Sequence, residues 1–471
     1  MKRIIAFIFC FFIVVSTVDA ANYYVSQSTG DDGNVGSEVS PWQYAPWMPS
    51  ATSTSDGTAL TGDDFVYLKR GDTWTAEPII SEESGTSGHP ITFDAYGTGA
   101  LPILNGNNNT GFSGWYNGVL QINNHNYITV KNIEFRYCNK DTAAIIADGG
   151  GSVTGIILDG CTFDYNYSDN LDGYMALMIR NDANSTGISY ITIQNCTIQD
   201  TGHNGIRIWN QDTTSNISYG TIKDNVFFDC DHHGVDMYRD SGIMMNTYFT
   251  ITGNTFQECG GAFYVPNMNN STIAYNKIWD DNTDQSGDTY GIKLDDLNGG
   301  TPTGNVIVGN IIWDYDSATG GHAIWLYGTS GTIVANNTIY SNYAACTFAS
   351  NTSLTNSNNL SYANTGDGSC ADYGSDPKFT NSGSDDFTLQ SDSTAIGAGA
   401  DLGNGLLYGL DPISTWTDNV KPIDQDSYGD WELGAFVYIE AAELGGPGTI
   451  AGGGSGSIAG GGSGSIIGTA P

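Results

Sequence analysis

The sequence predicts an all-β protein: a single-stranded right-handed parallel β-helix (solenoid) with an amino-terminal cap and a disordered tail rich in Gly and Ser. Three observations predict this fold. A short apolar motif recurs at irregular intervals, one position of that motif is a column of Asn and Cys, and the chain has 62 glycines but only 15 Lys and Arg. Many short strands joined by tight turns are typical of this composition.

The recurring motif has six residues, apolar-x-x-Asn/Cys-x-apolar, and an imperfect first copy at 130–135. Successive copies start 28, 35, 29, 29, 22, 34 and 27 residues apart. This spacing is too irregular for a propeller or a helical repeat, but it suits stacked coils with short strands and loops of varying length. We therefore expect coils from Ile122 to Leu360. The clearer copies are LDGCTF (158–163), IQNCTI (193–198), IKDNVF (222–227), ITGNTF (251–256), IAYNKI (273–278), IVGNII (307–312) and VANNTI (334–339).

The fourth position of the motif predicts a ladder of stacked side chains inside a turn, because side-chain amides can hydrogen-bond from coil to coil. We also expect this position to take the left-handed backbone conformation, which Asn tolerates. Its residues are Cys161, Cys196, Asn225, Asn254, Asn276, Asn310 and Asn337.

A second column lies eight residues after the motif starts and contains Cys138, Cys230 and Cys259. Cys230 and Cys259 would lie on neighbouring coils, either as a disulfide or as stacked free thiols. Cys346 and Cys370 form the other plausible pair.

The composition of the chain indicates its segments, and its net charge limits the partners that it can bind. Lys2-Arg3, the apolar run 4–15 and Val18-Asp19-Ala20 predict a Sec signal peptide over 1–20, and hence a secreted or cell-surface protein without a membrane span. The net charge of −36 disfavours nucleic acid, and we expect a monomer. The expected segments are 21–121 (amino-terminal segment and first coils), 122–360 (coils), 361–440 (closing segment) and 441–471 (Gly/Ser-rich tail).

The second strand of each coil carries the functional prediction. Its first and third residues are apolar and should point inward, so the second and fourth should point outward in two stacked columns. Aromatic rings stack on sugars and cations pair with acidic groups, so these columns predict a glycan-binding groove, against the plainer reading of a solvated sheet face. One column is Met178, Arg207, Asp236, Tyr264, Lys293 and Trp325, and the other is Arg180, Trp209, Tyr238, Pro266, Asp295 and Tyr327.

Histidines mark a position within this groove. His203 and His232 each lie three residues before a second strand, so they should stack on adjacent coils beside Arg207 and Asp236. His233 follows, and His322 lies two residues before its strand. The alternative is that His203 and His232 are turn residues that bond to the backbone.

The residues that frame the coils carry a resemblance to a known superfamily. They are the segments 23–42 (YYVSQSTGDDGNVGSEVSPW), 68–74 (LKRGDTW), 85–106, 376–400 and 431–436 (WELGAF). With the coils, they resemble the right-handed parallel β-helix superfamily of secreted carbohydrate-active proteins, which includes pectate lyases, alginate lyases and chondroitinase-like enzymes. The resemblance covers residues 22–438. The fold also carries hydrolases, epimerases and adhesins, so it implies no single reaction.

The resemblance implies a polysaccharide as partner, and a lyase acting on a uronic-acid-containing glycan is the leading expectation. Lyases of this fold take the C5 proton with Lys or Arg, so Lys293 or Arg207 would be the base. His232, His203 and Asp236 complete the catalytic candidates, while Asp236, Asp295 and Asp296 are candidate calcium ligands. The substrate-binding candidates are Arg180, Trp209, Tyr238, Tyr264, Trp325 and Tyr327.

Two alternatives stay open. An inverting hydrolase needs paired carboxylates, and Asp236 and Asp295, two coils apart, would be separated by roughly 9–10 Å. However, Asp229-Cys-Asp-His-His-Gly and Gly291-Ile-Lys only loosely resemble the polygalacturonase pattern, and the Asp-Pro-His-Asp motif of mannuronan epimerases is absent. A non-catalytic glycan-binding adhesin is the other alternative.

Overall fold

The structure is a computed structural model in which the chain divides into two compact units, residues 1–438 and 439–471. The expected signal peptide and Gly/Ser-rich tail lie outside the described residues, apart from Ala20. The described residues are 20–107, 118–138, 141–164, 175–239, 246–266, 268–280, 289–296, 299–315, 321–366, 368–370, 373–403, 406–416 and 420–440.

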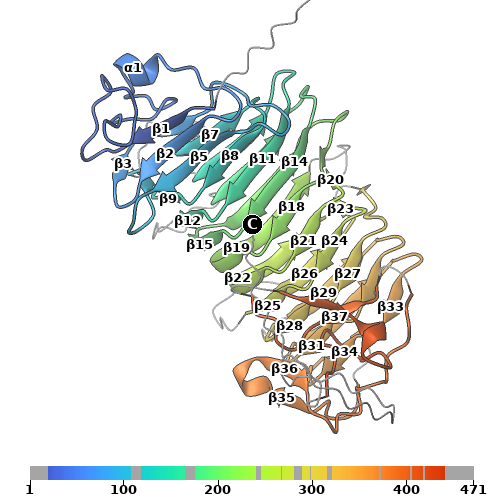
Figure 1. The fold of residues 1–471 in the computed structure, drawn as a ribbon. Helices are drawn as coiled ribbons and strands as arrows, with labels where there is room; N and C mark the ends of the chain where they lie inside the picture. Colours follow the sequence, from blue (N-terminus) through green and yellow to red (C-terminus); the bar gives the residue numbers. More distant parts are fainter. Residues whose placement is uncertain are drawn as a thin grey trace, which may run out of the picture. The chain divides into compact units, whose positions relative to one another are not determined.

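The first unit is a stack of coils whose strands pair in parallel with their counterparts in the next coil (Figure 1). Three faces run along the stack. Face A contains β1 (Asn22–Val25), β2 (Phe65–Lys69), β5 (Ile91–Tyr96), β8 (Ile128–Lys131), β11 (Val153–Asp159), β14 (Ile188–Gln194), β18 (Thr221–Lys223), β21 (Thr250–Thr252), β24 (Thr272–Ala274), β27 (Val306–Val308), β30 (Ile333–Ala335) and β33 (Thr355–Ser357), with short β17 (Ile217–Ser218), β20 (Asn246–Thr247) and β23 (Met268–Asn269) beside it.

Faces B and C share two long strands, β19 (Val226–Arg239) and β22 (Thr255–Tyr264), whose first parts lie in face B and second parts in face C. The other strands of face B are β3 (Thr73–Thr75), β6 (Ile103–Asn105), β9 (Glu134–Arg136), β12 (Thr162–Asp164), β15 (Thr197–Thr201), β25 (Lys277–Trp279), β28 (Ile311–Trp313), β31 (Thr338–Tyr340) and β34 (Leu360–Tyr362). Those of face C are β4 (Ile79–Ile80), β7 (Leu120–Asn123), β10 (Ala143–Ala147), β13 (Leu177–Asn181), β16 (Asn204–Asn210), β26 (Tyr290–Leu294), β29 (His322–Tyr327) and β32 (Ala344–Ala349).

Short elements cover the two ends of the stack. The four-residue α1 (Ser53–Asp56) belongs to the amino-terminal part. At the other end, β35 (Phe379–Asn381) pairs antiparallel with β36 (Asp386–Leu389), and β37 (Tyr408–Leu410) pairs antiparallel with β38 (Pro422–Asp424). Two 3-10 turns, η2 (Ser382–Ser384) and η3 (Gln425–Ser427), lie in the same segment.

Parallel pairing begins earlier than the first clear motif. β1 already pairs with β2 and β3 with β6, so the stack starts within the segment 21–121 and ends at β34. Inward side chains of successive coils lie in contact: the rings of Phe227 and Phe256 stack with their centroids 4.4 Å apart. Because each coil buries its apolar side chains only against its neighbours, the stack as a whole forms the core.

The asparagine ladder is confirmed, but its backbone conformation was wrongly predicted. Asn254 Nδ2 donates to Asn276 Oδ1 at 2.9 Å, and Asn276 Nδ2 donates to Asn310 Oδ1 at 3.0 Å. The left-handed residue is the one before the ladder position, as in Asn195 (φ 54°) and Asp224 (φ 54°). This preceding residue turns the chain, so the ladder residue can point inward and bond to the next coil.

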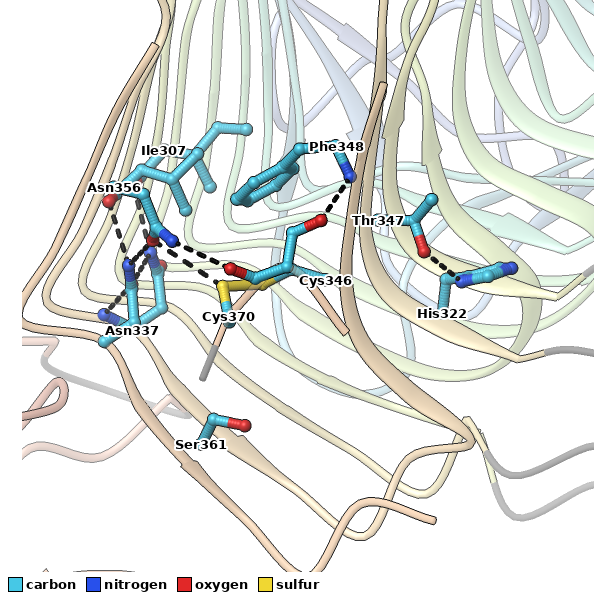
Figure 2. The surroundings of a disulfide bond; sticks show 12 residues. Ile307, His322, Asn337, Cys346, Thr347, Phe348, Asn356, Ser361 and Cys370 are labelled. Atoms are coloured by element: carbon cyan, nitrogen blue, oxygen red, sulfur yellow. Dashed lines mark hydrogen bonds between the residues drawn. A yellow bond between two sulfur atoms is a disulfide. The ribbon is translucent and has the colours of Figure 1, made fainter. Parts of the chain in front are cut away.

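The cysteines separate into one disulfide and a set of buried thiols. Cys346 on β32 is bonded to Cys370 (Figure 2), as the pairing from sequence proposed. Cys230 and Cys259 are register partners on β19 and β22, yet both are free. Of the two possibilities for them, the structure therefore has stacked thiols.

Candidate functional site

The two columns that the sequence predicts to form a groove lie on face C, and the register of one column is as predicted. Arg207 pairs with Asp236, Asp236 with Tyr264, Tyr264 with Lys293, and Lys293 with Trp325. In-register parallel pairing therefore brings residues 118 positions apart in sequence onto one line along the stack. In the second column, Arg180, Trp209 and Tyr238 are register partners as well.

Three residues of the two columns are buried rather than exposed on the surface of face C. Met178 and Asp236 are each only 3% exposed, and Pro266 is buried. Met178 and Asp236 each lie next to Arg207 in the register, and Asp236 is also bonded to Asn204. Pro266 lies beyond the end of β22, where the alternation of the strand no longer applies.

Two arginines lie over aromatic rings at one end of the groove. Arg207 Cζ is 5.0 Å from the ring centroids of both Trp209 and Tyr238, and Arg180 Cζ is 5.1 Å from that of Trp209. Arg180 also contacts Asp182, while Arg207 Nε lies 3.5 Å from Asp236 Oδ2. The rings hold the guanidinium groups in place along the face.

Lys293 forms the second cationic point. Its Nζ lies 4.3 Å from the ring centroid of Trp325 and 5.1 Å from those of Tyr264 and Tyr290. Asp295 Oδ2 lies 3.7 Å from the same Nζ and accepts a hydrogen bond from the Tyr264 hydroxyl at 3.5 Å. The Lys293 side chain therefore ends between three rings and a carboxylate.

Burial shifts the pKa of two groups in this column. Desolvation raises the pKa of Asp236 to about 6, although Arg207 and Asn204 both act to lower it. Desolvation and the nearby carboxylates of Asp295 and Asp236 raise the pKa of Tyr264 above its usual value. Tyr264 therefore keeps its proton at neutral pH, and Asp236 exchanges its proton in the mildly acidic range.

The predicted histidine stack is present. The rings of His203 and His232 lie 4.5 Å apart, and the His232 N–H donates to the His203 carbonyl at 2.8 Å. The bond between these two residues is a main-chain bond between neighbouring coils, and His232 lies within β19 rather than in a turn. His232 is exposed and His203 is half-buried, so the imidazole of His232 faces solvent beside the groove.

Sequence reasoning missed the buried network beneath these histidines. His233 is 4% exposed; its Nε2 lies 2.5 Å from the Tyr290 hydroxyl and its Nδ1 lies 3.2 Å from Asn204 Oδ1. Desolvation, followed by the charges of His232 and its neighbours, holds the pKa of His233 well below the usual value, so its ring is neutral.

A signal for this network was present in the sequence. His233, Gly261 and Tyr290 are register partners, and each lies two residues before the first apolar residue of a second strand predicted from the sequence (Val235, Phe263 and Ile292). An added Cβ on Gly261 would lie 2.7 Å from the Tyr290 ring and 2.8 Å from the His233 ring. The glycine therefore leaves the space through which His233 reaches Tyr290.

The remaining candidates are placed as follows. Trp325 contacts Lys293, and its ring lies 4.8 Å from that of His322, whose Nδ1 lies 3.0 Å from Thr347 Oγ1. Tyr327, at the end of β29, is 43% exposed. The Asp296 carboxyl lies against Gly328, where an added Cβ would be 2.6 Å from it.

The acidic residues proposed as calcium ligands do not form a cluster. Within the described ranges, no group of three or more His, Cys, Asp or Glu side chains is spaced to hold a metal ion. Asp236 is bonded to Asn204, and Asp295 pairs with Lys293. With Asp296 they do not fit a resident calcium site, so calcium binding stays a prediction and no step below depends on it.

Comparisons with known proteins agree on the fold. A family model described as a right handed beta helix region matches residues 176–318, which contain β13, β16, β19, β22 and β26 of face C. The chain also aligns with the lacto-N-biosidase of family GH136 from Eubacterium ramulus, with 15% identity, a TM-score of 0.50, and coverage of 71% of this chain and 65% of that chain. This chain thus spans about two thirds of the length of the biosidase. A comparison with curated proteins found no match to this chain.

Two other solved structures align with TM-scores below 0.5. Pectate lyase Pel9A aligns over 89% of this chain and 97% of its own, with 17% identity and a TM-score of 0.49. PfbA, a surface adhesin of Streptococcus pneumoniae, aligns over 65% of this chain and 79% of its own, with 14% identity and a TM-score of 0.47. No helix in the described part of the chain is long and apolar enough to cross a membrane. The chain has the right-handed parallel β-helix fold that its motifs predicted.

Proposed function

We propose that the protein is an exported polysaccharide lyase whose face C binds a uronic-acid-containing glycan and cleaves it by β-elimination. One observation carries the proposal. In a chain with 51 acidic and 15 basic residues, Arg207 and Lys293 occupy the same column, with the protonated Tyr264 between them.

The spacing of the two cations suits an extended acidic polymer. They are three coils apart, so about 14 Å separates them along the stack. One carboxylate cannot contact both, but two carboxylates on different sugars of one chain can. The aromatic rings beside each cation (Trp209 and Tyr238, then Trp325) supply flat apolar surfaces for the sugar rings between these points.

The ion pairs favour a different base from the one first expected. Lys293 and Arg207 each lie near a carboxylate of the protein, and as cations they are suited to pairing with a uronate carboxylate. His232 is exposed beside the column, and imidazole ordinarily titrates near neutral pH. We assign His232 as the base and His203, which stacks on it, as the residue that orients it.

The proposed step balances as follows. His232 accepts the proton from C5, the C5 electron pair forms the C4=C5 double bond, and the C4–O4 bond breaks. The Tyr264 hydroxyl donates its proton to the leaving O4, and the proton on His232 later returns to Tyr264 through solvent. Lys293 stabilises the charge that develops on the uronate carboxylate.

A glycoside hydrolase is a second candidate because of the two carboxyl groups in this groove. Asp236 has a pKa raised to about 6, whereas Asp295 lies within 3.7 Å of the Lys293 ammonium. Carboxyl groups whose environments differ in this way are typical of a general acid and a general base. Against this candidate, Asp236 is buried, so Arg207 or Tyr264 would have to move before it reached a substrate.

The test is an assay of the mature protein on a panel of uronate polymers (alginate, polygalacturonate, chondroitin and hyaluronan), each with and without calcium. A lyase gives an unsaturated product that absorbs in the ultraviolet. New reducing ends without that absorbance would support the hydrolase instead. Binding without any new chain ends would overturn both enzymatic assignments and favour an adhesin.

A further inference from the structure

A second pocket lies between face B and the closing segment, away from the strands of face C. It has a volume of about 510 Å³. Strands β22 and β25 form one side of it, and β36 with the loop after β37 forms the other. In Figure 1, β36 lies beside the last coils of the stack. The lining residues are Thr255, Lys277, Trp279, Asp385, Asp386, Phe387, Thr388, Pro412, Ser414, Thr415, Trp416 and Phe436.

The floor of the pocket is aromatic and cationic. Lys277 Nζ lies 5.2 Å from the ring centroid of Trp279, 5.3 Å from that of Trp313 and 5.9 Å from that of Trp416. Trp279 and Trp313 stack at 4.8 Å on neighbouring coils. In the part of the chain that the structure describes, Lys277 has no ion pair within 4.0 Å, so its ammonium can donate to a ligand.

Trp416 forms the opposite wall and is fixed in place. Its Nε1 donates to the Tyr275 carbonyl at 2.9 Å, and its ring packs edge-on against Phe436 at 6.4 Å. This bond spans 141 residues and attaches the closing segment to the turn between β24 of face A and β25 of face B. The half-buried rings of Trp279 and Trp416 therefore belong to separate elements that are held on two sides of one space.

Polar groups at the rim set the charge of the pocket. Asp385 is exposed, and Asp386 accepts hydrogen bonds from the N–H and hydroxyl of Thr388. Two carboxylates against one ammonium disfavour an acidic ligand. Tryptophan faces stack on the C–H faces of a pyranose ring, while carboxylates, hydroxyls and an ammonium bond to its hydroxyl groups.

We propose that this pocket binds a neutral sugar residue between Trp279 and Trp416, with Asp385 and Lys277 bonded to its hydroxyl groups. This inference goes beyond the proposed lyase and does not depend on it, because the pocket lies on face B and shares no residue with the groove of face C. The pocket would anchor a neutral glycan, or the neutral branches of a polymer. Face C would bind and cleave its own substrate at a separate place on the stack.

The test is isothermal titration of the full chain with neutral hexaoses of β-glucan, β-mannan, β-xylan and β-galactan. At least one should bind, and Trp416→Ala or Asp385→Asn should weaken that binding roughly tenfold or more, because stacking and charge-assisted hydrogen bonds each supply over 1 kcal/mol. Lys293→Met, on face C, is the matched control and should leave this binding unchanged.

Three outcomes would overturn the proposal. They are failure of all four oligosaccharides to bind at millimolar concentration, unchanged binding in both pocket variants, and preferential binding of an acidic hexaose that Lys277→Met abolishes. Thermal unfolding of each variant shows whether it is folded, and Trp416→Phe, which keeps a ring at this wall, should retain part of the affinity. Uronate cleavage by Trp416→Ala should match wild type, so loss of the pocket is distinguishable from failure of the lyase assignment.

Discussion

His233 Nε2 and the Tyr290 hydroxyl lie 2.5 Å apart although one whole coil of the β-helix separates their strands. The glycine at the intervening register position, Gly261, makes this contact possible. The bond ties β19 to β26 directly beneath Tyr264 and Lys293. It therefore fixes the spacing of the groups to which we assign binding and proton transfer.

Gly261→Ala should break this contact. The added methyl group would meet both rings at less than 3 Å, so one ring must move, at a cost of about 1–3 kcal/mol. Thermal unfolding should show a lower Tm, and glycan cleavage should fall with it. Gly383→Ala is the matched control, because its Cβ would meet only a side-chain oxygen at 3.8 Å. Equal Tm values for the two variants would contradict this account of Gly261.

Asp236→Asn should stabilise the protein at neutral pH. The native carboxyl has a pKa of about 6, whereas an Asp carboxyl ordinarily has a pKa of 3.8, so between these pH values the native state binds more protons than the unfolded state. The free energy of unfolding of the wild type therefore falls as pH rises through this window, by roughly 3 kcal/mol for this group. Asn cannot ionise, so the free energy of unfolding of the variant does not fall through this window because of residue 236.

Denaturant unfolding at pH 4.5 and 7.5 measures the effect. The stability advantage of Asp236→Asn should be larger at pH 7.5. Asp212→Asn is the contrasting control: burial acts to raise the pKa of Asp212, but hydrogen bonds from Thr214, Ser215 and Asn184 hold it below its usual value. That variant should be less stable than wild type at pH 7.5. A pH-independent effect of Asp236→Asn would rule out the buried, shifted carboxyl.

Lys293→Met should weaken binding of acidic glycan. Methionine keeps much of the side-chain length between Trp325, Tyr264 and Tyr290 but removes the charge. Loss of one charge-assisted contact corresponds to about 1.5–3 kcal/mol, or roughly a ten- to hundredfold rise in KM. The control is Lys223→Met on β18 of face A, which should behave as wild type. A similar KM for both variants would place the acidic glycan on another face.

Removal of the Cys346–Cys370 disulfide should destabilise the end of the stack. The bond closes a loop with a sequence separation of 24, and the chain-entropy estimate for such a loop is roughly 3 kcal/mol. Cys346→Ala/Cys370→Ala should unfold at lower temperature than the oxidised wild type, and reduction of the wild type should have the same effect. Unchanged unfolding after reduction would show that the Asn356 and Ser369 hydrogen bonds around the disulfide suffice (Figure 2).

The features that the repeat determines, the register and the outward column, could be predicted from the sequence. The motif spacing sets the register, and the register places Arg207, Tyr264 and Lys293 in one column. The burial of Asp236 was not predictable from alternation alone, because it depends on how Arg207 packs and on Asn204 bonding from the neighbouring strand.

Features formed by segments that lack the repeat could not be predicted from the sequence. The pocket around Lys277 exists because the closing segment folds back and bonds Trp416 to Tyr275, 141 residues earlier. No periodicity relates these two positions. Likewise, the left-handed residue at the ladder turn was assigned one position too late, because Asn, Asp, Gly and Tyr all occupy it in different coils.

The most direct test of the central claim is a comparison of wild type with Tyr264→Phe on the uronate polymer that the wild type cleaves. Phenylalanine keeps the ring beside Lys293 but removes the proton donor, so kcat for unsaturated product should fall by roughly a hundredfold or more while KM changes little. An unchanged kcat in Tyr264→Phe would contradict the assignment of face C as the site of β-elimination.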